Sequence, residues 1–518
     1  MGPMNDDAGP CSLYDSYQSP LAGRYASEEM KRIWSPRRKF EIWRKIWLAV
    51  AEAEREVGLP VGEEQVAELR ANLDVTDADI ERAAELEAEL RHDVMAHVHA
   101  WGERCPMAKP IIHLGMTSQD VNDNCELVLI RLAQRCIDRG VERLAFALAD
   151  AADRWKSLPA LAFTHYQPAQ PTSFGRRCAQ WDYDLLRAAE AGPRSADDKL
   201  RGLRGATGTQ ASYLNLLGGD GEQVRRLEVL FLDKLGKETG LSGSATLEAW
   251  GDADDPEMVD AFASHHTFLL TGQTYPRVVD AQIVANLATI CAALHKSATD
   301  IRLLCNRKEV DEPLAAKQIG SSAMPYKRNP MRCERVCGLA RFVMNLVGNA
   351  YDTAATQWLE RTLDDSSNRR LTLPEAFLAT DACLNIMTNV VAGLEVHEAQ
   401  VRKNLMAELP FLSTENILME AVKRGGDRQE LHEKIRVHAR EAAWRIKKEG
   451  AENDLIERLR ADDAFAGVRG MLTESELLDP MKYVGLAVEQ TERFLREIIE
   501  PMREEAGGVG APPADLRV

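Results

Sequence analysis

The sequence predicts an all-α protein with a long central helical bundle, and three observations support this class. Its 518 residues are 45% hydrophobic and 28% charged, so a large core can form. Aromatic residues make up only 6%, and Ala, Leu, Glu and Arg dominate long stretches, which favours helices because these side chains lose little rotamer freedom there. Several segments also repeat apolar residues at alternating spacings of three and four, as one face of a helix does.

The first helix is predicted from about Arg37 to Val57. Ser35 is a suitable N-cap and Pro36 suits the first helical position, while Gly58 and Pro60 follow the end. These signals define the start and the stop of the helix independently of its apolar stripe.

A second, charged helical stretch is predicted from Asp77 to Trp101. The chain then changes character at CPMAKPIIHLGMTSQDVNDN, which is rich in proline and small polar residues. We place a domain boundary there and predict three domains: a helical N-terminal domain over residues 1–117, a central bundle over 118–396 and a helical C-terminal domain over 397–518. The last residues, GGVGAPPADLRV, are typical of a frayed tail.

The central domain contains four long predicted helices: Asp123–Ser157, Pro276–Leu304, Pro330–Trp358 and Pro374–Leu394. The first has a coiled-coil-like seam, interrupted only by Gln134. The second is apolar on most faces, so we expect it to be buried nearly all round. Helices of about 30 residues span roughly 45 Å. Such a bundle has more apolar surface than one chain can cover, and a homo-oligomer is therefore expected.

The net charge of −17 argues against a generic nucleic-acid or anionic-membrane surface, so any anionic ligand must be bound by a local cluster of cations. The ten cysteines include no CxxC pair, and we expect reduced thiols in a cytoplasmic protein. The start, MGPMNDDAGP, lacks an apolar run, and no stretch approaches about 18 uninterrupted apolar residues. Neither secretion nor membrane insertion is expected.

One candidate functional segment is QIGSSAMPYKRNPMRCER, residues 318–335, which lies between two long predicted helices. Small residues and two prolines favour a loop. It brings together four cations: Lys327, Arg328, Arg332 and Arg335. In so acidic a chain this pattern indicates an anion-binding loop, although a solvated basic turn has the same composition.

Two further segments contain histidines. In FTHYQPAQPTSFG, His165 could exchange a proton near neutral pH, or it could be structural. In RHDVMAHVH, His92 and His99 lie two turns apart on one helix face, but no carboxylate or cysteine completes a zinc-like set. The sequence therefore predicts no metal site.

Two polar segments could bind anions. In HLGMTSQDVND, Thr117 and Ser118 precede a long helix, where hydroxyl and amide groups could hold a carboxylate, or Thr117 could simply cap the helix. ERTLDDSSNRR gathers Arg361, Ser366, Arg369 and Arg370, which suit a phosphate or carboxylate, or ion pairs with Asp364 and Asp365.

The loop SSAMPYKRNP resembles the signature of the fumarase/aspartase superfamily. The match includes Ser321, Ser322, Met324, Pro325, Lys327, Asn329 and Pro330. RHDVMAHVH, HLGMTSQDVNDN, the His165 loop, GATGTQAS, TGQTY and ERTLDDSSNRR also follow the order of the superfamily's lyases that cleave succinylated purine nucleotides. The resemblance extends from about Pro20 to Pro501.

This resemblance implies a three-domain helical subunit in a homotetramer, with each active site built from three subunits. It implies β-elimination of fumarate from two succinylated nucleotides of the purine pathway, without metal or organic cofactor. Ser321 corresponds to the catalytic base, and His165 to the acid that protonates the departing nitrogen. A serine has far too high a pKa for this task unless Lys327 and loop amides stabilise its alkoxide.

The resemblance also implies binding roles. Lys327 and Asn329, with Thr117, Ser118 and Gln273, would hold the succinyl carboxylates. The nucleotide phosphate would be bound by Arg24, Tyr25, Ser366 and Arg370, and the same pocket would be lined by Arg91, His92, Asp93, Arg335 and Arg361.

One departure lies between Gly236 and His265, where the chain carries extra residues including EAWGDADDPEMVDAF. A surface excursion and a modified substrate gate both fit this composition. Two alternative functions also remain open: another superfamily lyase, such as argininosuccinate lyase, fumarase or a carboxymuconate cycloisomerase, or a non-catalytic scaffold. The cations in RHDV and ERTLDDSSNRR favour a phosphorylated substrate, and the intact Ser321, His165 and Lys327 argue against a scaffold.

Overall fold

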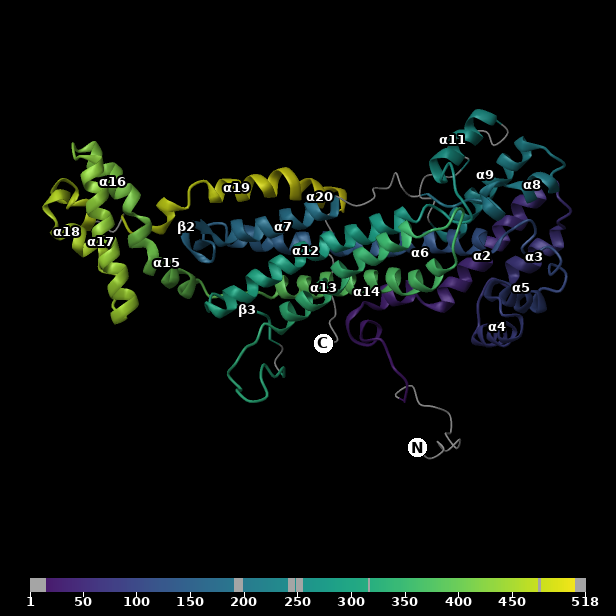
Figure 1. Ribbon diagram of the computed structural model, residues 1–518, viewed down its shortest axis with the longest axis horizontal. Helices are drawn as coiled ribbons and strands as arrows, with labels where there is room; N and C mark the ends of the chain where they lie inside the picture. The colour runs from purple at the N-terminus through teal and green to yellow at the C-terminus, as the bar shows by residue number, and fades with distance from the viewer. Residues whose placement is uncertain are drawn as a thin grey trace.

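A computed structural model describes residues 15–190, 199–240, 247, 255–314, 317–473 and 477–507. The molecule is elongated, with long helices side by side along its middle, N-terminal helices at one end and C-terminal helices at the other (Figure 1). Most of the regular structure is helical, so the predicted all-α class is confirmed. The predicted tail beyond Gly507 and residues 241–246 and 248–254 of the predicted insertion lie outside the described residues.

The N-terminal helices follow a π-helical turn (Leu21–Tyr25). They are α1 (Glu28–Ile33), α2 (Pro36–Glu56), α3 (Glu63–Ala71), α4 (Asp77–Leu90) and α5 (Asp93–Arg104). Helix α2 begins as predicted, since the Ser35 hydroxyl accepts a hydrogen bond from the Arg38 amide.

The single helix predicted from Asp77 to Trp101 is wrong. Arg91 adopts a left-handed conformation (φ 52°) that ends α4, and His92 then caps α5. The break turns the side chains of these two residues away from the regular helix surface.

Five helices form the bundle: α6 (Ser118–Arg154), α7 (Phe174–Glu190), α12 (Val278–Asn306), α13 (Met331–Ala355) and α14 (Asp364–Ala392). Helix α12 packs against α13, α14 and α7, while α6 packs against α7 and α14. The predicted seam lies on α6, where its apolar residues are buried and Gln134 is half-buried.

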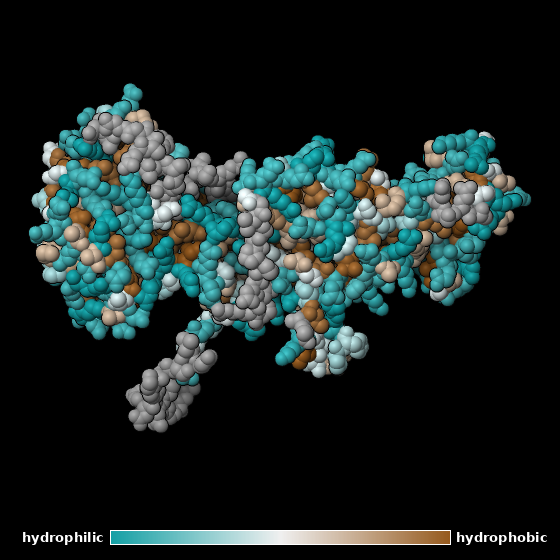
Figure 2. Space-filling view, turned by 180° about the vertical axis from the view of Figure 1, so that it is seen from behind, coloured by the Kyte–Doolittle hydropathy of each residue, from teal (hydrophilic) through white to brown (hydrophobic). Residues whose placement is uncertain are grey.

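The prediction that α12 is buried nearly all round is wrong for a single chain. Its exposed residues include Val278, Gln282, Thr289, Ala292, Lys296 and Leu303, which follow one stripe. By length and composition α12 could cross a membrane, but 56% of its most apolar stretch is buried, as is usual for the core helix of a bundle. Figure 2 shows hydrophobic residues exposed in patches along the middle of the molecule.

Helix α14 begins at Asp364, ten residues before the predicted start at Pro374. Pro374 lies inside the helix, where it removes one backbone hydrogen bond without ending it. Because DDSSNRR is therefore helical, Ser366 and Arg370 share one face, four residues apart.

The other helices flank the bundle. Near the N-terminal end lie α8 (Ala211–Leu216), α9 (Gly221–Thr239), which packs against α2, and α11 (Pro256–His266). The C-terminal group is α15 (Glu398–Leu412), α16 (Thr414–Lys423), α17 (Arg428–Glu449) and α18 (Leu455–Ala461), most of which surrounds a small core of its own. Helices α19 (Ala487–Phe494) and α20 (Glu500–Glu505) are the last two α-helices among the described residues, and α19 packs along α7.

The described strands form two short antiparallel pairs, of which the first is a hairpin and the second joins strands far apart in the sequence. Strands β1 (Pro159–Thr164) and β2 (Gln167–Ser173) pair next to α15, and β3 (Val310–Asp311) pairs with β4 (Glu395–Val396). The segment between β3 and α13, which contains SSAMPYKRNP, projects from the side of the bundle (Figure 1).

Candidate active site

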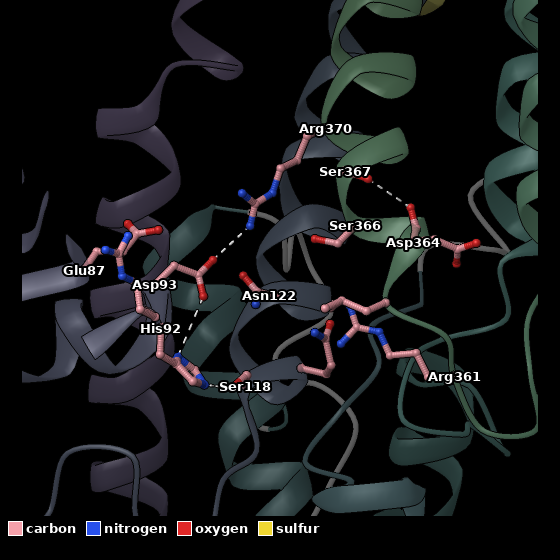
Figure 3. Close-up of a pocket in the computed structure, with 13 residues that line it drawn as sticks. Glu87, His92, Asp93, Ser118, Asn122, Arg361, Asp364, Ser366, Ser367 and Arg370 are labelled. Atoms are coloured by element: carbon pink, nitrogen blue, oxygen red, sulfur yellow. Dashed lines mark hydrogen bonds and ion pairs between the residues drawn. The ribbon is translucent and has the colours of Figure 1, made fainter. Parts of the chain in front are cut away.

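A cavity of about 640 Å³ lies where the N-terminal ends of α5, α6 and α14 meet (Figure 3). Its lining residues are Glu87, Arg91, His92, Asp93, Ser118, Gln119, Asn122, Arg361, Leu363, Asp364, Ser366, Ser367 and Arg370. Seven of the predicted site residues, from three separate segments, therefore line one cavity: Arg91, His92, Asp93, Ser118, Arg361, Ser366 and Arg370.

The break between α4 and α5 builds one wall. His92 Nδ1 accepts a hydrogen bond from the Met95 amide at 3.3 Å, which places the ring proton on Nε2 when the imidazole is neutral. Nε2 lies 3.5 Å from the Ser118 hydroxyl. Across the cavity, Arg370 donates to Asp93 at 2.9 Å. The cavity thus has an imidazole beside a hydroxyl group, and an arginine whose present partner is the half-buried carboxylate of Asp93.

The start of α6 forms the rim. Thr117 caps this helix, and its amide donates to Asp120 at 2.8 Å. The side-chain amide of Gln273 makes two hydrogen bonds. Its nitrogen donates to the Thr117 hydroxyl at 2.9 Å, and its oxygen accepts from the backbone amide of Thr207 at 2.7 Å. Gln273 therefore joins the TGQTY and GATGTQAS segments to the helix end, where backbone amides and the helix dipole favour an anion.

A buried network of ion pairs orients the Arg361 side chain. The carboxylate of Asp365 accepts hydrogen bonds from Arg361 at 3.2 Å and from Arg277 at 2.8 Å, and Arg277 also donates to Asp123 at 3.1 Å. With its amide oriented to satisfy both neighbours, Gln119 donates to Asp123 and accepts from Arg361. Burial alone would lower the pKa of Arg277, but the surrounding negative charges, Asp123 foremost, together outweigh it and raise that pKa.

Arg369 does not reach the cavity, although the sequence placed it in the same cluster as Arg370. It is buried and donates to Asp280 at 2.7 Å and to Glu126. A step of one residue turns a helical side chain by about 100°, so Arg369 faces the core when Ser366 and Arg370 face the cavity. Burial opposes its charge, but the surrounding carboxylates raise its pKa well above the usual value.

His165 lies at the tip of the β1–β2 hairpin. Thr164 pairs with Gln167, and both residues between them have positive φ, 52° for His165 and 55° for Tyr166, as in a type I′ turn. The His165 side chain is exposed. The imidazole therefore lies exposed at the tip of a tight turn.

Ser321, Lys327 and Asn329 lie in the projecting segment. The Ser321 hydroxyl accepts a hydrogen bond from the Met324 amide at 3.2 Å, and the Asn329 side chain donates to the Gly320 carbonyl at 3.1 Å. Lys327 is exposed, and Arg335 follows on the first turns of α13.

One chain does not bring all of these residues together. Helix α6 starts at the cavity and ends near the β1–β2 hairpin, and its 37 residues span about 55 Å. His165 and the projecting loop therefore lie at the opposite end of the bundle from the cavity (Figure 1). Arg24 and Tyr25 form a third group near the middle of α14, where the Ser27 amide donates to Asp381 at 2.7 Å.

Several cavity residues were missed by the sequence analysis: Glu87, Gln119, Asn122, Leu363, Asp364 and Ser367. Asn122 lies one turn after Ser118 on α6, and this spacing could have identified it. The Arg361–Asp365 pair agrees with the ion-pair alternative given for ERTLDDSSNRR. The buried residues Asp123 and Arg277 gave no signal, because isolated charges in a sequence do not reveal their partners.

Comparisons with known proteins place this geometry in a family. Residues 23–251 and 261–345 match the Lyase family, and residues 410–494 match the family described as Adenylosuccinate lyase C-terminus. The gap at 252–260 falls within the segment predicted to carry extra residues. The structure is similar to 3-carboxy-cis,cis-muconate lactonizing enzyme from Pseudomonas putida, with a TM-score of 0.73, 23% identity and coverage of 92% of this chain and 98% of that one.

The fold and the matched segments define a lyase of the fumarase/aspartase superfamily. Adenylosuccinate lyase from Saccharomyces cerevisiae is 44% identical over 486 residues, covering 93% of this chain and 95% of the relative. That from Schistosoma mansoni is 43% identical over 94% of this chain and 96% of the relative. The chain belongs to the adenylosuccinate lyases, as the sequence predicted.

Proposed function

We propose that the chain eliminates fumarate from adenylosuccinate, giving AMP, and from succinylaminoimidazole-carboxamide ribotide, giving aminoimidazole-carboxamide ribotide. The observation that carries the proposal is the cavity between α5, α6 and α14, where three arginines and several hydroxyl donors lie together in a chain of net charge −17. Three carboxylates line the same cavity, and one of them, Asp93, is the present partner of Arg370. A substrate with a phosphate and two carboxylates needs such a local concentration of cations.

The cavity supplies the nucleotide half of the site. Arg91, Arg361 and Arg370 can pair with phosphate or carboxylate oxygens, with Ser118 and Ser366 as hydroxyl donors. Arg361 is pre-oriented by Asp365, so it loses little freedom on binding. Arg370 exchanges its partner Asp93 for the substrate anion.

The groups at the other end supply the chemistry. The Ser321 alkoxide removes the proton from the carbon next to a succinyl carboxylate, and the charge develops on that carboxylate as an aci-carboxylate. The carbon–nitrogen bond then breaks, fumarate forms, and His165 protonates the departing nitrogen. Lys327 and the loop amides stabilise the alkoxide and the developing charge.

The active site is completed by association of copies of the chain. The cavity and the β1–β2 hairpin lie at opposite ends of α6, whose 37 residues span about 55 Å, which is too far for one substrate to touch both. The exposed stripe of α12 offers a contact surface for a homotetramer, because Val278, Thr289 and Ala292 recur on one face of the helix and are exposed in the described part of the chain. The free, mostly buried thiols fit a reducing cytoplasm.

An ultraviolet absorbance assay with adenylosuccinate tests the function. Release of both AMP and fumarate supports it. A folded, oligomeric protein without turnover would contradict it, and turnover of argininosuccinate instead would assign the chain to the other superfamily activity.

A further inference from the structure

The paired strands β3 and β4 place two carboxylates against each other. Asp311 and Glu395 are direct cross-strand partners, and like charges in this arrangement repel. His397 adds a third ligand-type side chain, with Nε2 at 3.0 Å from the Asp311 carboxylate. Among the described residues, these three form the group of His, Cys, Asp and Glu side chains whose ligand atoms, all within 4.8 Å of one another, could hold a metal ion.

Arg328 already provides a cation at this group. Its two terminal nitrogens donate to the two oxygens of Glu395, each at 2.8 Å, and one of them lies 3.3 Å from Asp311. This two-pronged geometry is the strong form of an arginine–carboxylate pair. The hydrogen bond from Arg328 lowers the pKa of Glu395, so the carboxylate stays charged. The guanidinium thus relieves the repulsion between the two strands.

The same arginine closes the base of the signature loop. Arg328 also donates to the Glu312 carbonyl at 2.9 Å, which joins the two limbs of the loop. The Glu312 carboxylate in turn accepts hydrogen bonds from the amides of Arg332 and Cys333 at the start of α13, at 3.0 and 2.7 Å. The limbs also touch at Gly320, where a Cβ atom would lie 2.4 Å from the Lys327 carbonyl oxygen.

Beyond this base, the tip of the loop is weakly tied. The contacts within it are short-range, from the Met324 amide to Ser321 and from the Lys327 amide to the Met324 carbonyl at 3.0 Å. Ser321 and Lys327 therefore take their placement from the base, and Arg328 is the next residue after Lys327 in the chain.

We propose that Arg328 is a positioning residue for catalysis: it acts as an internal cation that locks the base of the signature loop to Asp311 and Glu395, and so sets where Ser321 and Lys327 stand. This role rests on the proposed function for its effect on turnover. Its effect on the loop itself does not depend on any substrate.

The test compares Arg328→Gln and Arg328→Lys with the unchanged protein. Hydrogen exchange of peptides covering residues 312–330 is expected to speed up about three- to tenfold in Arg328→Gln, with α12 and α14 unchanged. The kcat for adenylosuccinate should fall about tenfold or more, because a small misplacement of reacting groups is costly. The affinity for AMP, which the distant cavity binds, should change less than about twofold, and Arg328→Lys should lie between the two in both kcat and exchange rate.

A matched control is Arg436→Gln, which removes an arginine fork onto Glu433 at the exposed surface of α17. It should leave exchange of residues 312–330 and kcat unchanged. If Arg328→Gln does not fold, Glu395→Gln removes the partner charge while keeping the side-chain shape, and the same changes are expected.

If Arg328→Gln leaves hydrogen exchange of residues 312–330 unchanged, Arg328 does not hold the base of the loop. If exchange becomes faster but kcat stays normal, Arg328 does not position the catalytic residues. A proportional loss of AMP affinity, thermal stability and kcat would indicate a general structural defect and would also overturn the positioning role. If the unchanged protein does not turn over adenylosuccinate, the proposed function fails, while the exchange measurement still decides whether Arg328 holds the loop.

Discussion

Arg277 and Arg361 bind opposite oxygens of one buried carboxylate, that of Asp365, at 2.8 and 3.2 Å. Arg277 is buried, whereas Arg361 faces the cavity. The orientation of Arg361, for which we propose a role in substrate binding, is thus set by a buried charge network behind the cavity. Because α6, α12 and α14 each contribute to this network, packing of the bundle and shape of the site are coupled.

Asp365→Asn is expected to lower both stability and AMP affinity. The change keeps the side-chain shape but leaves two arginines without their shared charge, and breaking a buried pair costs about 3–5 kcal/mol. Urea unfolding and calorimetric titration with AMP measure the two effects. Glu103→Gln, which removes the exposed partner of Arg82, is the control and should change neither. Normal AMP affinity in Asp365→Asn would contradict the orienting role.

Sequence patterns predicted the long helices well because apolar spacing and caps are local signals, as Ser35 and Pro36 show at the start of α2. They failed where one residue decides the geometry. Arg91 adopts a left-handed conformation that no pattern marks, and Pro374 suggested a helix start although α14 accommodates it. Both errors fall at the cavity or on the helix that lines it.

The sequence identified residues of the candidate site, but not where they lie relative to one another. Motif resemblance selected His165 and Ser321 together with the cavity arginines, yet the chain holds these groups at opposite ends of α6. The Arg361–Asp365 pair was among the predicted alternatives because both residues lie in one segment, whereas Asp123 and Arg277 gave no signal because they are far apart in the sequence. Contacts of this kind arise only from tertiary packing.

Mild acid is expected to destabilise the fold through His97. Burial, helped by the nearby charge of Lys39, lowers the pKa of His97 from about 6.5 to about 4. Between pH 6.5 and 4 the unfolded chain therefore binds a proton at His97 that the folded chain does not. The contribution of neutral His97 to the free energy of unfolding is fully present above pH 6.5 and is lost as pH falls toward 4. Between pH 6.5 and 5 the loss is about 2 kcal/mol.

His97→Met separates this effect from other titrations. His97 packs between Phe40 and Trp43, where a flexible apolar side chain can replace it. Urea unfolding at pH 7.5, 6.5 and 5 should show a weaker dependence on pH than in the unchanged protein. An identical dependence would assign the acid sensitivity to other groups, of which His113, with its pKa also lowered to about 4 by burial, is the next to test.

Ala292→Glu is expected to dissociate the proposed homotetramer and to abolish turnover. Ala292 lies on the exposed stripe of α12, and a charge repeated in each copy would be buried there without a partner. Light scattering after gel filtration measures the assembly. Ala67→Glu, on the exposed surface of α3, is the control. An intact, active tetramer of Ala292→Glu would exclude this stripe as the contact surface.

His165→Ala and Ser321→Ala should each abolish turnover while leaving assembly and AMP binding largely intact, because both residues lie far from the cavity. Sharing of sites adds a sharper expectation. When inactive His165→Ala and Arg361→Gln chains are unfolded, mixed and refolded together, roughly a quarter of the sites should regain both groups. Turnover assays of the mixture measure this, and no recovery in a mixed oligomer would show that each chain supplies its own site.

Removing the Arg328 side chain should turn its pocket into a divalent-cation site. In Arg328→Ala, the oxygens of Asp311 and Glu395 and the imidazole of His397 are left without the guanidinium, and this set of ligands suits Zn²⁺. Equilibrium dialysis with Zn²⁺ should find one ion per chain that the unchanged protein does not bind, and the added ion should slow hydrogen exchange of residues 312–330 again. The double variant Arg328→Ala/His397→Ala, which lacks the nitrogen ligand, should bind Zn²⁺ much more weakly. Equal Zn²⁺ binding by the single and double variants would mean that the ion sits elsewhere, and no binding by either would mean that Asp311, Glu395 and His397 are held apart when the arginine is gone.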